Sequence, residues 1–132
     1  MRHYLPAWNK QRVLLMGFSQ GADVMPFVVN RLPAATRQRV KTVALLSLSQ
    51  TAVFEFHLQN WLGGGARDAV AVAPELLKIK GVRTLCIYGA DEKDSLCALP
   101  AAKAAQVIKL NGGHHFDGNY ANLATLILNR AR

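Results

Sequence analysis

The sequence predicts an α/β fold in which helices flank a mostly parallel sheet of about four strands. Four short apolar runs are separated by helical or irregular stretches, which is the pattern of parallel strands joined by crossovers. Polar motifs follow the first, third and fourth of these runs. Hydrophobic residues make up 51% of the 132 residues, enough for the core of a single domain. We therefore expect one domain over residues 1–132, with its functional motifs at the carboxyl edge of the sheet.

The regular elements are expected in a simple order along the chain. The first strand leads into a helix over residues 20–31, in which Pro26 should cause a kink or shorten the first turns. The last element is an amphipathic helix over residues 117–130, with Asp117 as its N-cap. The four strands are expected at residues 12–16, 42–48, 83–89 and 105–110.

The connecting segments are less regular. Residues 32–36 are expected to form a connector. Residues 53–58 alternate between apolar and polar side chains, as an extended edge segment does. Residues 60–68 contain three successive glycines and are expected to form a loop, and residues 74–78 a helical turn.

The composition favours anionic partners. The formal net charge is +8, from sixteen Lys and Arg against eight Asp and Glu. The basic residues are scattered and lack the interleaved aromatic residues of single-strand binders, so nucleic acid is not an expected partner. No apolar run is long enough to span a membrane, and the first eleven residues lack the apolar segment of a signal peptide.

The motif Gly17-Phe18-Ser19-Gln20-Gly21 lies between the first strand and the first helix. Gly-x-Ser-x-Gly in this position is the pattern of a nucleophile elbow, where glycines allow a sharp turn that lifts the serine hydroxyl above the sheet. Ser19 is therefore the candidate nucleophile, and the backbone amide of Gln20 is a candidate oxyanion donor. The alternative interpretation is a tight turn without a chemical role.

A serine nucleophile needs a base and an orienting acid, which this fold supplies in the order Ser, acid, His. Three carboxylates follow the third strand. Asp94 is the first choice because it precedes an apolar return to the core, Asp91 is the second and Glu92 the third. If these residues have no catalytic role, they form a solvated turn.

Two adjacent histidines follow the fourth strand, and His115 is chosen over His114 as the base because it precedes Phe116 in a glycine-rich turn. His114 is then expected to line the pocket. His3 and His57 are expected on the surface or in loops. Asp23, in the helix after the elbow, is expected to bond a neighbouring loop.

Four stretches taken together resemble the bacterial virulence protein VirJ and the C-terminal domain of its relative AcvB. They are GFSQGADVMPFVVNRLP, LLSLSQTAVFEFHLQNWLG, LCIYGADEKDSLC and NGGHHFDGNY, and the similarity runs from about Arg12 to Arg130. The resemblance implies an alpha/beta-hydrolase protein of the bacterial envelope, mostly periplasmic. It implies hydrolysis of aminoacylated, notably lysyl, phosphatidylglycerol, with Ser19, Asp94 and His115 as the triad and no metal or cofactor.

The resemblance also leaves alternatives open. Family members have several strands before the elbow strand, whereas here that strand begins at about Arg12. The chain is therefore expected to be a fragment, the C-terminal half of the alpha/beta-hydrolase fold, with the elbow strand at an exposed sheet edge and weak activity on its own. The alternatives are a non-catalytic interaction module associated with type IV secretion, a truncated inactive remnant, or a lipase or thioesterase of another family.

The two cysteines, Cys86 and Cys97, have no histidines spaced to complete a zinc site. Their spacing alone does not distinguish two thiols from a bridge. The resemblance to a periplasmic family favours a disulfide, which would close a small ring around the loop that carries the acids.

Overall fold

The computed structural model describes residues 11–54 and 69–132, and the structure below is that of these residues. Its main sheet has four parallel strands, as the sequence predicts, and their order is β1-β2-β5-β6. A second sheet pairs β3 (Thr51–Val53) with β4 (Ala69–Ala71) in antiparallel register. The strands of the main sheet are β1 (Val13–Phe18), β2 (Val40–Leu46), β5 (Arg83–Gly89) and β6 (Gln106–Leu110).

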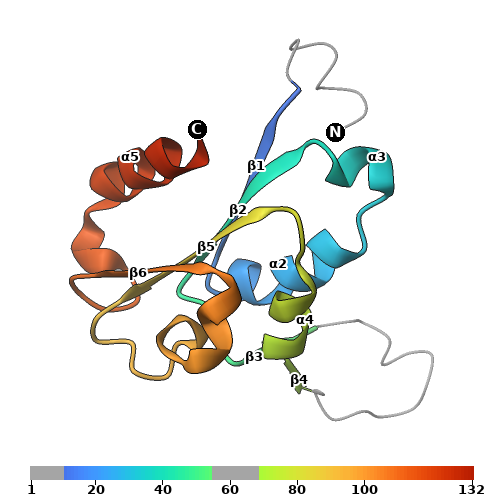
Figure 1. Ribbon diagram of the computed structural model, residues 1–132. Helices are drawn as coiled ribbons and strands as arrows, with labels where there is room; N and C mark the ends of the chain where they lie inside the picture. Colours follow the sequence, from blue (N-terminus) through green and yellow to red (C-terminus); the bar gives the residue numbers. More distant parts are fainter. Residues whose placement is uncertain (1–10, 55–68) are drawn as a thin grey trace, which may run out of the picture.

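Helices cover both faces of the main sheet. In Figure 1, α5 (Tyr120–Ala131) lies on one side of the sheet, and α2 (Gln20–Asn30) and α4 (Ala73–Lys78) lie on the other. The remaining helical segments are short: α3 (Ala34–Arg37) and the 3-10 turns Leu96–Ala98, Pro100–Ala104 and Phe116–Gly118.

The core consists of two apolar clusters separated by the sheet. Because side chains alternate along a strand, Val43 and Leu45 of β2 pack with the α2 and α4 side, whereas Ala44 and Leu46 pack with α5. Residues of β5 divide between the clusters in the same way, with Cys86 on the first side. Both central strands are thus buried on both faces, as strands of a parallel α/β sheet are.

The structure corrects several boundaries. Asp117 is not the N-cap of the last helix, because it lies in a 3-10 turn with φ 52° and the helix begins after it. Asn119 takes that place, and its side chain accepts a hydrogen bond from the amide of Asn122. The second strand ends at Leu46 rather than residue 48. The expected connector contains the short helix α3. Four expectations lie outside the described residues: residues 55–58 of the extended segment, the loop over residues 60–68, and the positions of His3 and His57.

The topology determines where the motifs meet. Since β1, β2, β5 and β6 are all parallel, their carboxyl ends lie at one edge of the sheet. The segments that begin at Ser19, Ser47, Ala90 and Asn111 leave the sheet there. Residues far apart in the sequence are thereby placed side by side.

Candidate active site

Ser19 sits in a strained turn between β1 and α2. Its backbone has φ 54° and ψ −124°, a conformation that residues with side chains rarely adopt and that is kept where the surrounding structure enforces it. The amide of Ser19 donates to the carbonyl of Leu46 at 3.0 Å, which fixes the turn to the end of β2. A Cβ atom on Gly17 would lie 2.4 Å from the carbonyl oxygen of Gly21, so strand and helix can approach only because residue 17 is glycine. A Cβ atom on Gly21 would meet nothing within 4 Å, so the steric requirement holds for the first glycine of the motif alone.

The Ser19 hydroxyl begins a chain of hydrogen bonds. Its Oγ lies 3.0 Å from Nε2 of His114, and Nδ1 of the same imidazole lies 2.8 Å from Oε1 of Glu92. A hydroxyl, an imidazole and a carboxylate joined in this order can transfer the serine proton to the imidazole while the carboxylate holds the ring in place. Both distances fall in the range that proton transfer requires.

The structure therefore corrects the expected acid and base. His115 makes no hydrogen bond to Ser19 in the described structure; its Nδ1 lies 3.4 Å from the hydroxyl of Tyr120, and its ring lies edge-on to that of His114 and tilted against that of Phe18. Asp94 is exposed, and its backbone carbonyl oxygen accepts a hydrogen bond from the side-chain amide of Gln50. The alternative His114 lies at hydrogen-bonding distance from Ser19, the alternative Asp91 is exposed, and Glu92, the third choice among the acids, contacts the histidine.

Glu92 is selected by the tight turn at the end of β5. The amide of Glu92 donates to the carbonyl of Gly89, and the Glu92 side chain folds back so that Oε2 accepts from the Gly89 amide at 2.8 Å. This leaves Oε1 free to face the histidine. The loop that carries His114 crosses directly over the same point, because a Cβ atom on Gly89 would lie 2.3 Å from the carbonyl oxygen of Gly113. The close approach of these two loops brings acid and base together.

A further serine, Ser47, also touches this site, although the sequence analysis did not single it out. Its Oγ lies 2.9 Å from Oε2 of Glu92 and 3.2 Å from the carbonyl oxygen of His114. The expected strand over residues 42–48 includes residue 47, and a residue inside a strand is not expected at the carboxyl edge of the sheet, where the motifs meet. The strand ends at Leu46, so Ser47 is the first residue beyond it.

Asp23 makes the expected loop contact, and Gln20 lies at the start of α2. Asp23, one helical turn after Ser19, accepts a hydrogen bond from the amide of Ser49 at 2.7 Å and so bonds a neighbouring loop. Burial raises the pKa of the Asp23 carboxyl, and the hydrogen bonds from Ser49 and the proximity of His114 partly oppose this effect. Gln20 is the first residue of α2, where backbone amides have no carbonyl one turn earlier to bond.

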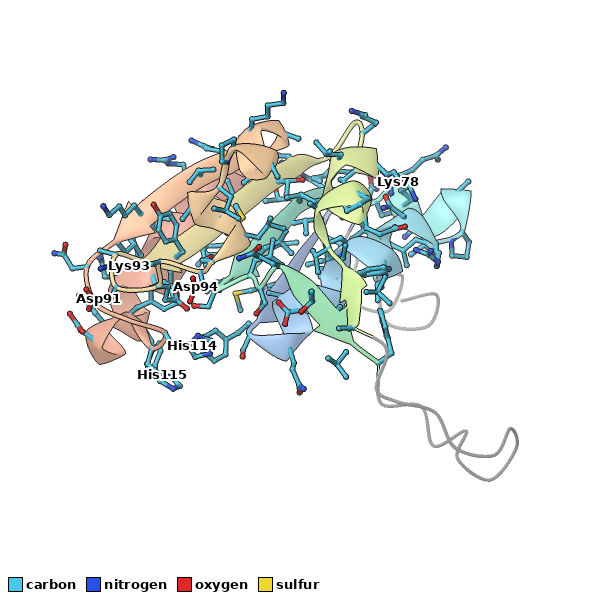
Figure 2. All side chains as sticks on the ribbon, turned by 90° about the horizontal axis from the view of Figure 1, so that it is seen from below. Lys78, Asp91, Lys93, Asp94, His114 and His115 are labelled. Carbon is cyan, nitrogen blue, oxygen red and sulfur yellow. A yellow bond between two sulfur atoms is a disulfide. The ribbon has the colours of Figure 1, made fainter. Side chains whose placement is uncertain are left out.

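A cavity of about 630 Å³ opens beside His114. Its walls come from the end of β2 and from the loop after β5, and they include the side chains of Asp91, Lys93 and Asp94. Figure 2 shows these three residues near His114 and His115 at one end of the molecule, far from Lys78 at the other end. The cavity thus adjoins His114, whose Nε2 bonds the Ser19 hydroxyl.

The expected disulfide is present. Cys86 of β5 is joined to Cys97, with 5.4 Å between the two Cα atoms, and both residues are buried. The bridge closes a ring that contains Glu92, and thereby ties the loop of the acid to the central strand. Disulfides of this kind persist in oxidising compartments outside the cytosol.

The chain matches the sequence family described as bacterial virulence protein (VirJ) over residues 1–132. The chain belongs to the VirJ family. The resemblance read from the four motifs is thus confirmed, and the association with virulence follows from the family's description.

Among solved structures, the fold of this VirJ family member is similar to a thioesterase domain from the curacin biosynthetic pathway. The TM-score is 0.59 at 17% sequence identity, and the match covers 90% of this chain and 67% of that chain. At this identity the likeness shows the fold, which is that of a hydrolase-like α/β protein. No curated protein sequence matches the chain. Within residues 11–54 and 69–132, no helix of this VirJ family member has the length and apolar character that crossing a bilayer requires.

Proposed function

We propose that this protein is a serine esterase of the bacterial envelope that hydrolyses aminoacylated phosphatidylglycerol through Ser19, His114 and Glu92. The observation that carries the proposal is the hydrogen-bond chain from the Ser19 hydroxyl through His114 to Glu92 at 3.0 and 2.8 Å. The strained φ of Ser19 adds support, because backbone strain concentrates at functional sites.

The proposed reaction has two halves. Ser19 Oγ attacks the aminoacyl carbonyl carbon while its proton passes to Nε2 of His114, and the amide of Gln20 donates to the oxygen that becomes negative. His114 then gives the proton to the glycerol oxygen, which leaves as the alcohol of phosphatidylglycerol. Water repeats the sequence on the acyl-enzyme and releases the free amino acid. Throughout, Glu92 holds the imidazole in the orientation in which Nε2 faces Ser19.

The charge distribution supports a cationic acyl group. The chain carries a net charge of +8, yet the wall of one cavity holds three acidic residues, Asp91, Glu92 and Asp94, against one basic residue, Lys93. Carboxylates at this place attract the ammonium of an aminoacyl ester. The excess of basic residues elsewhere supports docking of the protein on an anionic membrane surface.

The proposed location is the periplasm, where the protein has access to envelope lipids. The Cys86–Cys97 disulfide supports a compartment outside the reducing cytosol. The partners we propose are an ester-bearing lipid and, in line with the virulence family, proteins of a secretion apparatus.

The test uses vesicles of phosphatidylglycerol with and without its lysyl ester. The wild-type protein should release free lysine, and Ser19→Ala should release none above the rate without protein. Equal lysine release by both proteins would show that the esterase proposal is wrong. The double variant Asp91→Asn/Asp94→Asn should raise KM for the lysyl ester and leave KM for an uncharged p-nitrophenyl ester unchanged, which tests the cationic specificity separately.

A further inference from the structure

The side chain of Ser47, just beyond the central strand β2, contacts both the loop that carries the acid and the loop that carries the base. It is the first residue after β2, it is 3% exposed, and its amide donates to the carbonyl of Ile87 in β5 at 2.8 Å. Its Oγ reaches Oε2 of Glu92 at 2.9 Å and the carbonyl oxygen of His114 at 3.2 Å. A hydroxyl has one proton to donate, and the carboxylate is both the nearer and the charged acceptor.

The backbone conformation of Ser47 indicates that its hydroxyl, and not only its turn, is needed at this site. Ser47 has φ 55°, a left-handed conformation that costs energy for a residue with a side chain and none for glycine. If the turn alone were required, glycine would form it with less strain. The strain is retained together with a side chain that makes a partly buried hydrogen bond to Glu92, so the hydroxyl is the part of this residue that serves the site.

Glu92 needs donors on its second oxygen to present the first one correctly. Oε2 accepts from the Gly89 amide and from the Ser47 hydroxyl, and Oε1 faces Nδ1 of His114. The Gly89 donor is the last residue of β5, which carries the turn of Glu92. Among the described residues, Ser47 is the donor that links Oε2 to the end of a second strand, β2, so the carboxylate is held between two neighbouring strands of the sheet.

We infer that Ser47 is a positioning residue, which holds the carboxylate of Glu92 in the orientation that keeps His114 facing Ser19. The inference rests on the proposed esterase function. Ser47 does not touch the reacting atoms, so its removal is expected to lower kcat and to leave KM nearly unchanged.

Two variants separate the hydroxyl from the turn. Ser47→Gly removes the hydroxyl and relieves the left-handed strain, whereas Ser47→Ala removes the hydroxyl and keeps the strain. Initial rates of p-nitrophenyl butyrate hydrolysis and thermal melting are measured for both, beside wild type and Ser19→Ala. Both variants should lose about 10-fold in kcat, as expected for one hydrogen bond to a charged group. Ser47→Gly should melt at or above the temperature of Ser47→Ala.

The matched control is Thr84→Val, which removes another buried hydroxyl, one that bonds the carbonyl of Val82 at the opposite end of β5. This variant should keep wild-type kcat. If Ser47→Gly keeps wild-type kcat while Ser19-dependent turnover is present, Ser47 serves only the turn and the inference is wrong. If wild type shows no turnover above Ser19→Ala, the proposed function itself fails, and that outcome is distinguishable from the first.

Discussion

The carboxylates of Glu75 and Glu92 are each held by three donors, yet the donors differ in kind. Glu75, on α4, accepts from Asn30, Arg31 and Lys78 at 2.9 to 3.0 Å, and these contacts lower its pKa to about 2. Glu92 accepts from a backbone amide, a hydroxyl and an imidazole.

The difference separates a structural carboxylate from one that can serve chemistry. Two cations, Arg31 and Lys78, form ion pairs with the Glu75 carboxylate on the α2–α4 side of the sheet. The imidazole beside Glu92 can gain and lose a proton, and its other nitrogen reaches the Ser19 hydroxyl at 3.0 Å. A cavity also opens at this second site. The two carboxylates accept the same number of hydrogen bonds, and they differ in that Glu75 is bonded by two cations whereas Glu92 is bonded by an imidazole that reaches the serine.

The largest effect is expected for the base. His114→Gln should lower kcat for p-nitrophenyl butyrate by about 10⁴-fold, because no group remains to take the Ser19 proton. His115→Gln is the matched control and should stay within about threefold of wild type, since in the described structure its ring bonds Tyr120 and not Ser19. A comparable loss in both variants would contradict the assignment of the base to His114.

The next largest loss of kcat is expected for the acid, Glu92, and it tests whether Glu92 differs in function from an exposed carboxylate. Glu92→Gln should lower kcat by about 10²- to 10³-fold, because a neutral amide holds His114 in the wrong tautomer. Asp94→Asn changes an exposed carboxylate and should leave kcat for this uncharged ester within about threefold of wild type. If Asp94→Asn is the more damaging substitution, the acid is not Glu92.

The disulfide is expected to contribute less, and to stability more than to chemistry. Replacing both cysteines by alanine should lower the free energy of unfolding by about 2–4 kcal/mol, measured by urea denaturation, because the bridge restricts the unfolded chain around the Glu92 loop. Mass spectrometry of the unreduced, alkylated protein checks the bridge itself. Two alkylated thiols in protein exported to the periplasm would contradict it.

The smallest effect is expected at Glu75, and it should depend on pH. Because the pKa of Glu75 is lowered in the folded state, its ionised form stabilises the protein above the ordinary pKa of about 4.5, and this contribution is lost as the pH falls towards 2. Glu75→Gln should therefore cost about 1 kcal/mol at pH 7 and very little near pH 2, with kcat unchanged. A loss of kcat at full stability would show that the two carboxylates are not separate in function.

Sequence reasoning succeeded where the signal was local and periodic. The apolar runs predicted all four strands of the main sheet, and Gly17, Ser19 and their flanking elements predicted the elbow, because a strand–turn–helix with this spacing needs its first glycine. The loop contact of Asp23 was also predicted correctly, whereas the bridge between Cys86 and Cys97 was predicted by the family resemblance and not by the spacing of the cysteines.

The choice among neighbouring acids and histidines could not be made from the sequence. Glu92 reaches the histidine because its side chain folds back onto the Gly89 amide, which is a detail of one turn. His114 reaches Ser19 because its loop crosses over Gly89, which is a contact between segments remote in the sequence. Ser47 was missed for a related reason, since it depends on a strand end that differs by two residues from the expected one.

The central claim is that Ser19 is activated by His114. The most direct measurement is covalent labelling with a fluorophosphonate, which reacts with activated serines, followed by intact-mass and peptide mass spectrometry. The account predicts one adduct, located on Ser19, in wild type and in His115→Gln, and none in Ser19→Ala or His114→Gln over the same time. Labelling of wild type at a residue other than Ser19, or equal labelling of wild type and His114→Gln, would contradict it.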